Sequence, residues 1–207
     1  MSVHTQNSLN HGEVLDILFR EFDATYGMWV DADMAFLLKG WDDKLKSELN
    51  EKCVIVGMDY PKNRNRYMNF PTIMGCMFFT DVFREHGITF STKHSGGIRE
   101  LPVTKEEALI YHVPVGSKIN LDTGEMLPFI QKYGYEGKCL NSVHLFQKDG
   151  ERFFLDKDID NARKTSRVKG GNGKVCEAQL NGEVFFTHLS ESRYRKYNED
   201  PLSVVWL

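Results

Sequence analysis

Short apolar runs alternate with amphipathic helical segments through the first part of this chain. Residues 12–27, GEVLDILFREFDATYG, predict a helix that stops near Gly27. The run MWV at 28–30 then predicts a buried strand, residues 40–49 a helix, and CVIVG at 53–57 a second buried strand. The apolar side chains at helical spacing in the first helix are Val14, Leu15, Leu18, Phe19 and Phe22. This order favours an α/β sheet with covered faces, whose ligands gather at the carboxyl ends of the strands.

The middle of the chain gives weaker signals. NFPTIMGCMFF at 69–79 is apolar enough for the core, VFREHG at 82–87 suits a short helix, and HSGGIRELP at 94–102 is typical of a loop. DTGEMLPFIQKYG predicts a helix from near Thr123, in which Pro128 is tolerated only in the first turn and otherwise breaks the helix.

Two β-hairpins are predicted toward the carboxyl end. VHLFQKDGERFFL turns at Asp149-Gly150 and CEAQLNGEVFFTHL at Asn181-Gly182, both favourable for tight reversals. No internal repeat divides the chain, and its 207 residues suit one large domain or two small ones. We therefore expect one mixed-sheet domain over residues 1–207, flanked by helices and carrying hairpins in its later part.

Composition excludes several classes of protein. A net charge of −3, from 26 basic and 29 acidic side chains, gives no general basis for nucleic-acid binding. The four cysteines have no paired spacing, so we expect buried thiols rather than a zinc site or disulfides. No run is long enough to cross a membrane, and the polar start does not resemble a signal peptide. The expected location is the cytoplasm.

Asp31 and Asp33 lie one residue apart, directly after the first predicted strand. In a strand-end turn, residues i and i+2 can project into one volume, where two carboxylates repel unless a cation or protons intervene. Oxygen ligands suit Mg²⁺ or Mn²⁺, which complete their coordination with phosphates and water. The alternative is structural, with one aspartate capping the next turn and the other facing solvent.

The wider block YGMWVDADMAFLLKGWDDKLKSELNEKCVIVG resembles the Asp-x-Asp region of GT-A-fold glycosyltransferases. NFPTIMGCMFF is similar to the strand that lines the sugar pocket in that family, and LDTGEMLPFIQKYG to the acidic segment near the acceptor. VFFTHLSESRYRKY is similar to the late strand whose histidine completes the metal site. The resemblance implies transfer of a sugar from a nucleoside-diphosphate donor to an acceptor that the sequence does not identify.

The same resemblance implies roles for particular residues. Asp31, Asp33 and His188 would bind Mn²⁺ or Mg²⁺, and Asp122 would accept a proton from the acceptor hydroxyl. The residues implied at the donor diphosphate are Ser190, Ser192, Arg193 and Lys196. Structural alternatives stay open: His188 can be a satisfied strand-end histidine, Asp122 a helix cap, and the basic residues a solvated face.

Only 30 residues precede Asp31, whereas the family's sheet begins with strand-helix units that bind the nucleoside base. The resemblance therefore implies a GT-A-like domain that is incomplete at its amino end. The sugar, the nucleotide, the stereochemical outcome, activity of the chain alone and the oligomeric state are not readable from the sequence.

Two other functions use the same residues. Paired aspartates with magnesium also serve phosphohydrolases and nucleotidyltransferases, although GGNGK at 170–174 lacks the spacing of a Walker phosphate loop. Alternatively, the basic, glycine-rich segment 163–174 would bind an anionic partner in a non-catalytic module. The absence of aromatic residues among its charges favours a solvated loop instead.

Overall fold

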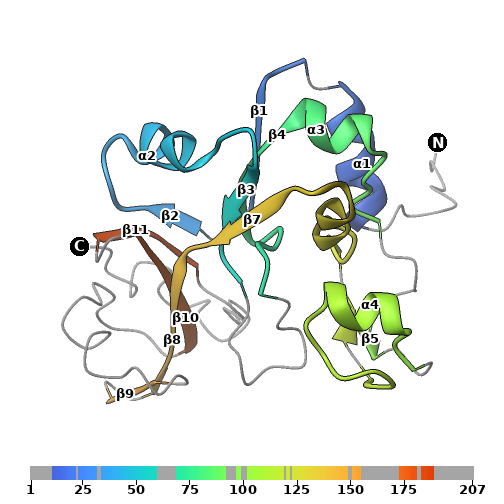
Figure 1. Ribbon diagram of the computed structural model, residues 1–207. Coiled ribbons are helices and arrows are strands. Elements are labelled where there is room, and N and C mark those ends of the chain that lie inside the picture. The colour runs from blue at the N-terminus through green and yellow to red at the C-terminus, as the bar shows by residue number, and fades with distance from the viewer. Residues whose placement is uncertain are drawn as a thin grey trace, which may run out of the picture.

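The computed structural model shows a mixed α/β protein with a four-stranded mixed sheet, a five-stranded antiparallel sheet and a two-stranded ladder (Figure 1). The structure describes residues 11–21, 23–31, 34–59, 69–91, 97–98, 102–118, 120–121, 123–148, 151–154, 173–180 and 183–188. No helix within these ranges is long and apolar enough to cross a membrane.

The four-stranded sheet has the order β1-β4-β3-β7. Its strands are β1 (Tyr26–Val30), β4 (Gly75–Phe79), β3 (Cys53–Gly57) and β7 (Glu136–Cys139). β4 is antiparallel to both β1 and β3, and β7 is parallel to β3, so β1, β3 and β7 share one direction. Their carboxyl ends therefore meet at one edge of the sheet, which we call the rim.

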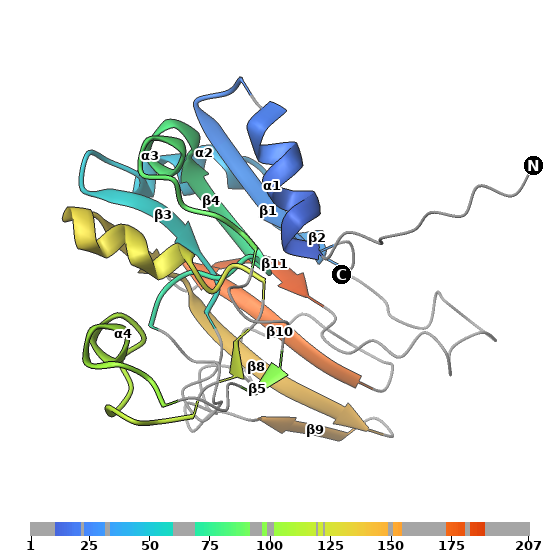
Figure 2. The same ribbon diagram turned by 90° about the vertical axis from the view of Figure 1, so that its right-hand side faces the viewer.

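A large aromatic core fills the face of this sheet that is covered by α1 (His11–Glu21) and α3 (Thr80–Glu85) (Figure 2). Phe78 of β4 is fully buried there and contacts the rings of Phe19, Phe83 and Phe90 at centroid distances of 5.3–6.0 Å. The 3₁₀ helix η1 (Leu127–Tyr133) and α4 (Lys105–Ile110) contribute further buried residues to the same core. α1 is thus fixed to the sheet through Phe19.

The opposite face carries α2 (Trp41–Glu48) and a second core, which the two large sheets share (Figure 1). Leu45 of α2, Val56 of β3 and Phe185 of the other sheet are all buried in it. Two ion pairs join the helix to the sheets, because Lys44 contacts Glu183 of the other sheet and Glu48 contacts Lys138 of β7. α2 therefore links the two sheets.

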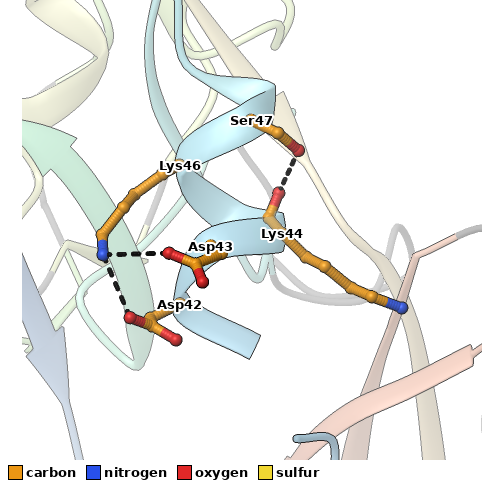
Figure 3. A network of polar contacts seen from close by, with 5 residues as sticks. All are labelled: Asp42, Asp43, Lys44, Lys46 and Ser47. Carbon is orange, nitrogen blue, oxygen red and sulfur yellow. Dashed lines mark hydrogen bonds and ion pairs between the residues drawn. The ribbon is translucent and has the colours of Figure 1, made fainter. Parts of the chain in front are cut away.

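Charges along α2 are arranged in pairs. Lys46 Nζ lies 3.0 Å from Asp42 Oδ2 and 3.5 Å from Asp43 Oδ1, while Lys44 points away on the other side of the helix (Figure 3). The Lys46 ammonium lowers the pKa of Asp42, and the Asp42 carboxylate raises the pKa of Lys46 in return. Lys44 is the residue of α2 that pairs with the second sheet, through Glu183.

The five-stranded sheet joins segments from both halves of the chain. Its order is β2-β11-β10-β8-β9, with β2 (Met34–Phe36), β11 (Glu183–His188), β10 (Gly173–Leu180), β8 (Asn141–Lys148) and β9 (Glu151–Phe154). β8 follows β7 after a single residue, Leu140, so the two sheets are continuous along the chain. β8 pairs with β9 and β10 with β11, while the turn residues 149–150 and 181–182 lie outside the described ranges.

Several expectations need correction. The segment 28–30 is not a wholly buried strand, because β1 lies at the edge of its sheet and Val30 is exposed. The predicted apolar face of α1 is buried at Leu15 and Phe19, but Val14 and Leu18 are exposed. Within the segment expected to be a loop, Gly97–Ile98 form β5, which pairs with β6 (Asn120–Leu121).

The region after Thr123 is helical but tighter than expected. It forms the 3₁₀ helix η1, with Pro128 in the first turn, where its missing N–H costs nothing, and Gly134 at the end with φ 86°. The sequence reasoning missed α4. Its signal was present, because Thr104 and Glu107 form a capping box at the helix start.

Candidate functional site at the rim

Asp31 lies at the rim, directly after β1, at the strand end that the sequence predicts. Its N–H donates to the Met74 carbonyl at 3.1 Å, and its own carbonyl accepts from the Met34 N–H at 3.1 Å. The first bond extends the β1–β4 ladder by one residue, and the second closes the turn that leads into β2. The backbone of Asp31 is therefore fixed from both sides, and its side chain is half-buried.

His188 lies beside this turn although it is more than 150 residues away in the sequence. β11 pairs antiparallel with β2, and the register places His188 opposite Met34. Opposed residues in an antiparallel pair have Cα atoms about 4.5–5.5 Å apart. The backbone of the late histidine is thus adjacent to the residue that directly follows Asp33.

The other residues singled out from the sequence lie outside the described ranges. These are Asp33, Asp122, Ser190, Ser192, Arg193 and Lys196. Among the residues that the structure describes, no three His, Cys, Asp or Glu side chains gather closely enough to hold a metal ion. Of the three proposed metal ligands, the described structure thus fixes the position of Asp31 and the backbone of His188. In such a donor set the carboxylate oxygens would suit Mg²⁺ or Mn²⁺, whereas an imidazole is a ligand more typical of transition metals.

A second rim carboxylate, Asp59, was not singled out from the sequence. It follows β3 by two residues and is buried, with an exposed fraction of 5%. The Cys139 thiol donates a weak hydrogen bond to Asp59 Oδ2 across 3.9 Å. Burial raises the pKa of Cys139, and the negative charge of Asp59 raises it further. The motif VIVGMD repeats the strand-then-aspartate pattern of MWVD, and this was the signal that could have found it.

The DTGE segment also reaches the rim. Gly124 donates its N–H to the Phe90 carbonyl at 2.8 Å, and a Cβ on Gly124 would lie 2.5 Å from Ile73, just before β4. The next residue, Glu125, is buried, as is the hydroxyl of Thr72, which has no hydrogen-bond partner among the described residues. The sequence suggested Asp122 as the proton acceptor in this segment. In the structure, the described acidic residue of the segment is Glu125, which is buried.

The three thiols whose side chains the structure describes have no features of nucleophiles. Cys53, Cys76 and Cys139 are free thiols, and burial raises the pKa of each, that of Cys76 to about 12. Because the thiolate is the reactive form, these groups are protonated and unreactive at neutral pH. Of the groups that the structure describes at the rim, the carboxylates of Asp31 and Asp59 are therefore better suited to ligand chemistry than the thiols.

No family model matches this chain, and comparisons with curated proteins and with solved structures likewise found no match.

Proposed function

We propose that this protein is a metal-dependent glycosyltransferase of the GT-A type, which moves a sugar from a nucleoside-diphosphate donor to an acceptor. One observation supports the proposal: the pairing of β2 with β11 brings the backbone of His188 opposite Met34, three residues after Asp31 in the sequence. The sequence resemblance calls for a late histidine near these aspartates, and β11 pairs with β2, which follows them in the sequence, through a long-range contact that periodicity alone does not predict.

Asp31, Asp33 and His188 would bind Mn²⁺ or Mg²⁺ in this proposal. A divalent cation held there supplies positive charge to the diphosphate of the donor, where negative charge grows as the sugar departs. The chain's own contribution is preorganisation. The hydrogen bonds that the Asp31 N–H donates to Met74 and that the Asp31 carbonyl accepts from Met34 hold the Asp31 backbone in place, and such preorganisation lowers the reorganisation needed when charge develops.

The remaining roles follow from the same proposal. Arg193 and Lys196, with the hydroxyls of Ser190 and Ser192, lie in the segment that continues from β11 and would bind the departing phosphate. Asp122 would accept the proton of the acceptor hydroxyl, for which its carboxyl must lie within hydrogen-bond reach of that group.

The test is titration calorimetry of the full chain with a panel of nucleoside diphosphates, with and without Mn²⁺. We expect the native chain to bind at least one of them in a metal-dependent way, and Asp33→Ala to bind it roughly 10–100-fold more weakly. His188→Gln should weaken the metal-dependent part in the same direction. Equal affinity of the native chain and Asp33→Ala would contradict the proposed site.

Asp43→Ala is the matched control. Asp43 is also an aspartate near β2, but its side chain is 82% exposed and makes only a long ion pair with Lys46. Its replacement should leave metal-dependent binding unchanged. Product analysis then identifies the reaction: free sugar or a glycosylated acceptor supports transfer, whereas inorganic phosphate or pyrophosphate would point to phosphohydrolase or nucleotidyltransferase chemistry instead.

A further inference from the structure

The rim ends of β1 and β3 are both hydrogen-bonded to β4, which lies between them. On the β1 side, the Asp31 N–H donates to the Met74 carbonyl at 3.1 Å. On the β3 side, the Met58 N–H donates to the Gly75 carbonyl at 2.9 Å. These two carbonyls belong to consecutive residues, so neighbouring peptide groups of β4 hold the backbones of both flanking strands. The position of β4 at the rim therefore decides where the backbone of Asp31 lies.

Gly57 determines how closely β3 approaches β4 at this point. It is buried and pairs with Cys76 in the ladder between the two strands. A Cβ on Gly57 would lie 2.4 Å from the Gly75 carbonyl oxygen, 2.6 Å from Cys76 Cβ and 2.7 Å from Cys76 Cα. Two of these three neighbours are backbone atoms, which cannot turn aside as the end of a flexible side chain can. Any side chain at position 57 would therefore displace β4.

Position 57 requires space and not an unusual backbone conformation. The φ of Gly57 lies outside the left-handed region, unlike that of Gly124 or Gly134. Alanine can therefore adopt the extended backbone of this strand position, and the cost of a methyl group there comes from its contact with β4.

The displacement would reach Asp31 by two routes. Gly75 directly follows Met74, so a shift of the Gly75 carbonyl also turns the peptide group that accepts from the Asp31 N–H. Cys76 pairs with Trp29 in the β1–β4 ladder, and Trp29 lies two residues before Asp31. Both routes run through backbone hydrogen bonds, which weaken steeply when their geometry is distorted.

We propose that Gly57 is a positioning residue for Asp31: because it carries no side chain, β4 can lie where the Met74 carbonyl holds the Asp31 backbone at the rim. Its importance for metal binding rests on the proposed function, in which Asp31 is a ligand of the metal ion. Its effect on the Asp31 backbone does not depend on that function, so the two are tested separately.

Residue-resolved amide exchange of the full chain tests the effect on the backbone. In Gly57→Ala, the Asp31 amide should exchange about tenfold faster than in the native chain, because its hydrogen bond to Met74 is weakened. The Ala108 amide of α4, which donates to the Thr104 carbonyl at 2.8 Å, is the internal reference and should keep its native rate. An unchanged rate at Asp31 in folded Gly57→Ala would overturn the proposal.

Gly27→Ala is the matched control. A Cβ on Gly27 would also be crowded, at 2.6 and 2.8 Å, but these neighbours are ring atoms of Phe78. Gly27 also lies toward the other end of β1 from Asp31. This variant should lower the free energy of unfolding without selectively accelerating exchange at Asp31. Equal acceleration at Asp31 in the two variants would indicate a general loosening of the sheet and would refute the positioning role.

Titration calorimetry with Mn²⁺ and the panel of nucleoside diphosphates tests the consequence for the site. Gly57→Ala should bind roughly tenfold more weakly than the native chain, whereas folded Gly27→Ala should bind like the native chain. Native affinity in Gly57→Ala would overturn the role of this glycine at the metal site. A native chain that binds no diphosphate contradicts the proposed function instead, and amide exchange then decides the positioning.

Native-state exchange of the unmodified chain in increasing urea covers the case in which Gly57→Ala does not fold. The Asp31 and Met58 amides should open with the same free energy and the same urea dependence, because consecutive peptide groups of β4 hold both of them. Opening of the Asp31 amide alone, with a smaller urea dependence, would refute the coupling through β4.

Discussion

Replacing Asp16 by alanine would remove the polar clamp that holds α1 on the domain. The Asp16 carboxylate accepts hydrogen bonds from the Phe90 N–H at 2.7 Å, the Ser91 N–H at 3.2 Å and the Ser91 hydroxyl at 2.6 Å, and also contacts the Thr89 hydroxyl. Gly12 supports this approach, since a Cβ there would lie 2.5 Å from Ser91 Cα. One side chain thus joins the helix to the segment that follows α3.

The expected loss of unfolding free energy depends on the hydrogen-bond donors that Asp16→Ala leaves without their acceptor. A hydrogen bond to a charged group contributes about 1.5–3 kcal/mol, but these bonds share one acceptor group and are not additive. The freed hydroxyls of Thr89 and Ser91 can turn to water because both residues are half-buried, whereas Phe90 is fully buried, so its amide loses its acceptor. We expect Asp16→Ala to lower the free energy of unfolding by about 2–4 kcal/mol.

Urea unfolding followed by tryptophan fluorescence measures this loss, because Trp29 is buried in the core that α1 covers. Asp16→Asn, which retains one carbonyl acceptor, should lose roughly half as much. The control is Asp81→Ala, whose carboxylate is 83% exposed and forms only a 3.5 Å contact with Arg84. A loss below about 1 kcal/mol for Asp16→Ala, or one equal to that of Asp81→Ala, would refute the clamp.

Two further predictions concern a helix start and a buried thiol. Thr104→Ala removes one partner of the capping box on α4 and should cost about 1 kcal/mol of unfolding free energy in the same assay, while Thr104→Ser should cost little; equal losses would contradict the cap. Burial raises the pKa of Cys76 to about 12 from 9.0, so above pH 9 the unfolded chain releases a proton that the native chain keeps. Stability should therefore fall as pH rises, by up to about 1.4 kcal/mol per pH unit, and Cys76→Ala should lack this component; parallel pH profiles of the two proteins would contradict it.

Local elements of this fold were readable because their signals are local. The helical spacing of Leu15 and Phe19 predicted α1, and the uninterrupted apolar run CVIVG predicted β3. The position of β1 at an edge was not readable, because it depends on β4 inserting between β1 and β3, a pairing of segments about 50 residues apart. The exposure of Val30 follows from that edge position and not from its own sequence pattern.

At the candidate site, too, local features could be predicted from the sequence and features that depend on long-range contacts could not. A carboxylate after an apolar strand was recognisable at Asp31, and the same reasoning extends to Asp59 once β3 is known to run parallel to β1. Burial of Glu125 was not recognisable, because it arises from the contact of Gly124 with Ile73 and Phe90. A sequence pattern can indicate which residue types are chemically suitable, but tertiary contacts decide which of them are buried at the rim.

The pairing of β2 with β11 has a consequence for the order of folding. It joins residues 34–36 to residues 186–188 through three residue pairs, and the Leu37 N–H extends it by donating to the Phe185 carbonyl at 2.8 Å. Contacts between such distant segments carry a large loop-closure cost, so this ladder should form late and open early in native-state exchange. The turn containing Asp31 would then acquire its histidine neighbour only in the last stage of folding, and any ligand that bridges the two strands would slow their separation.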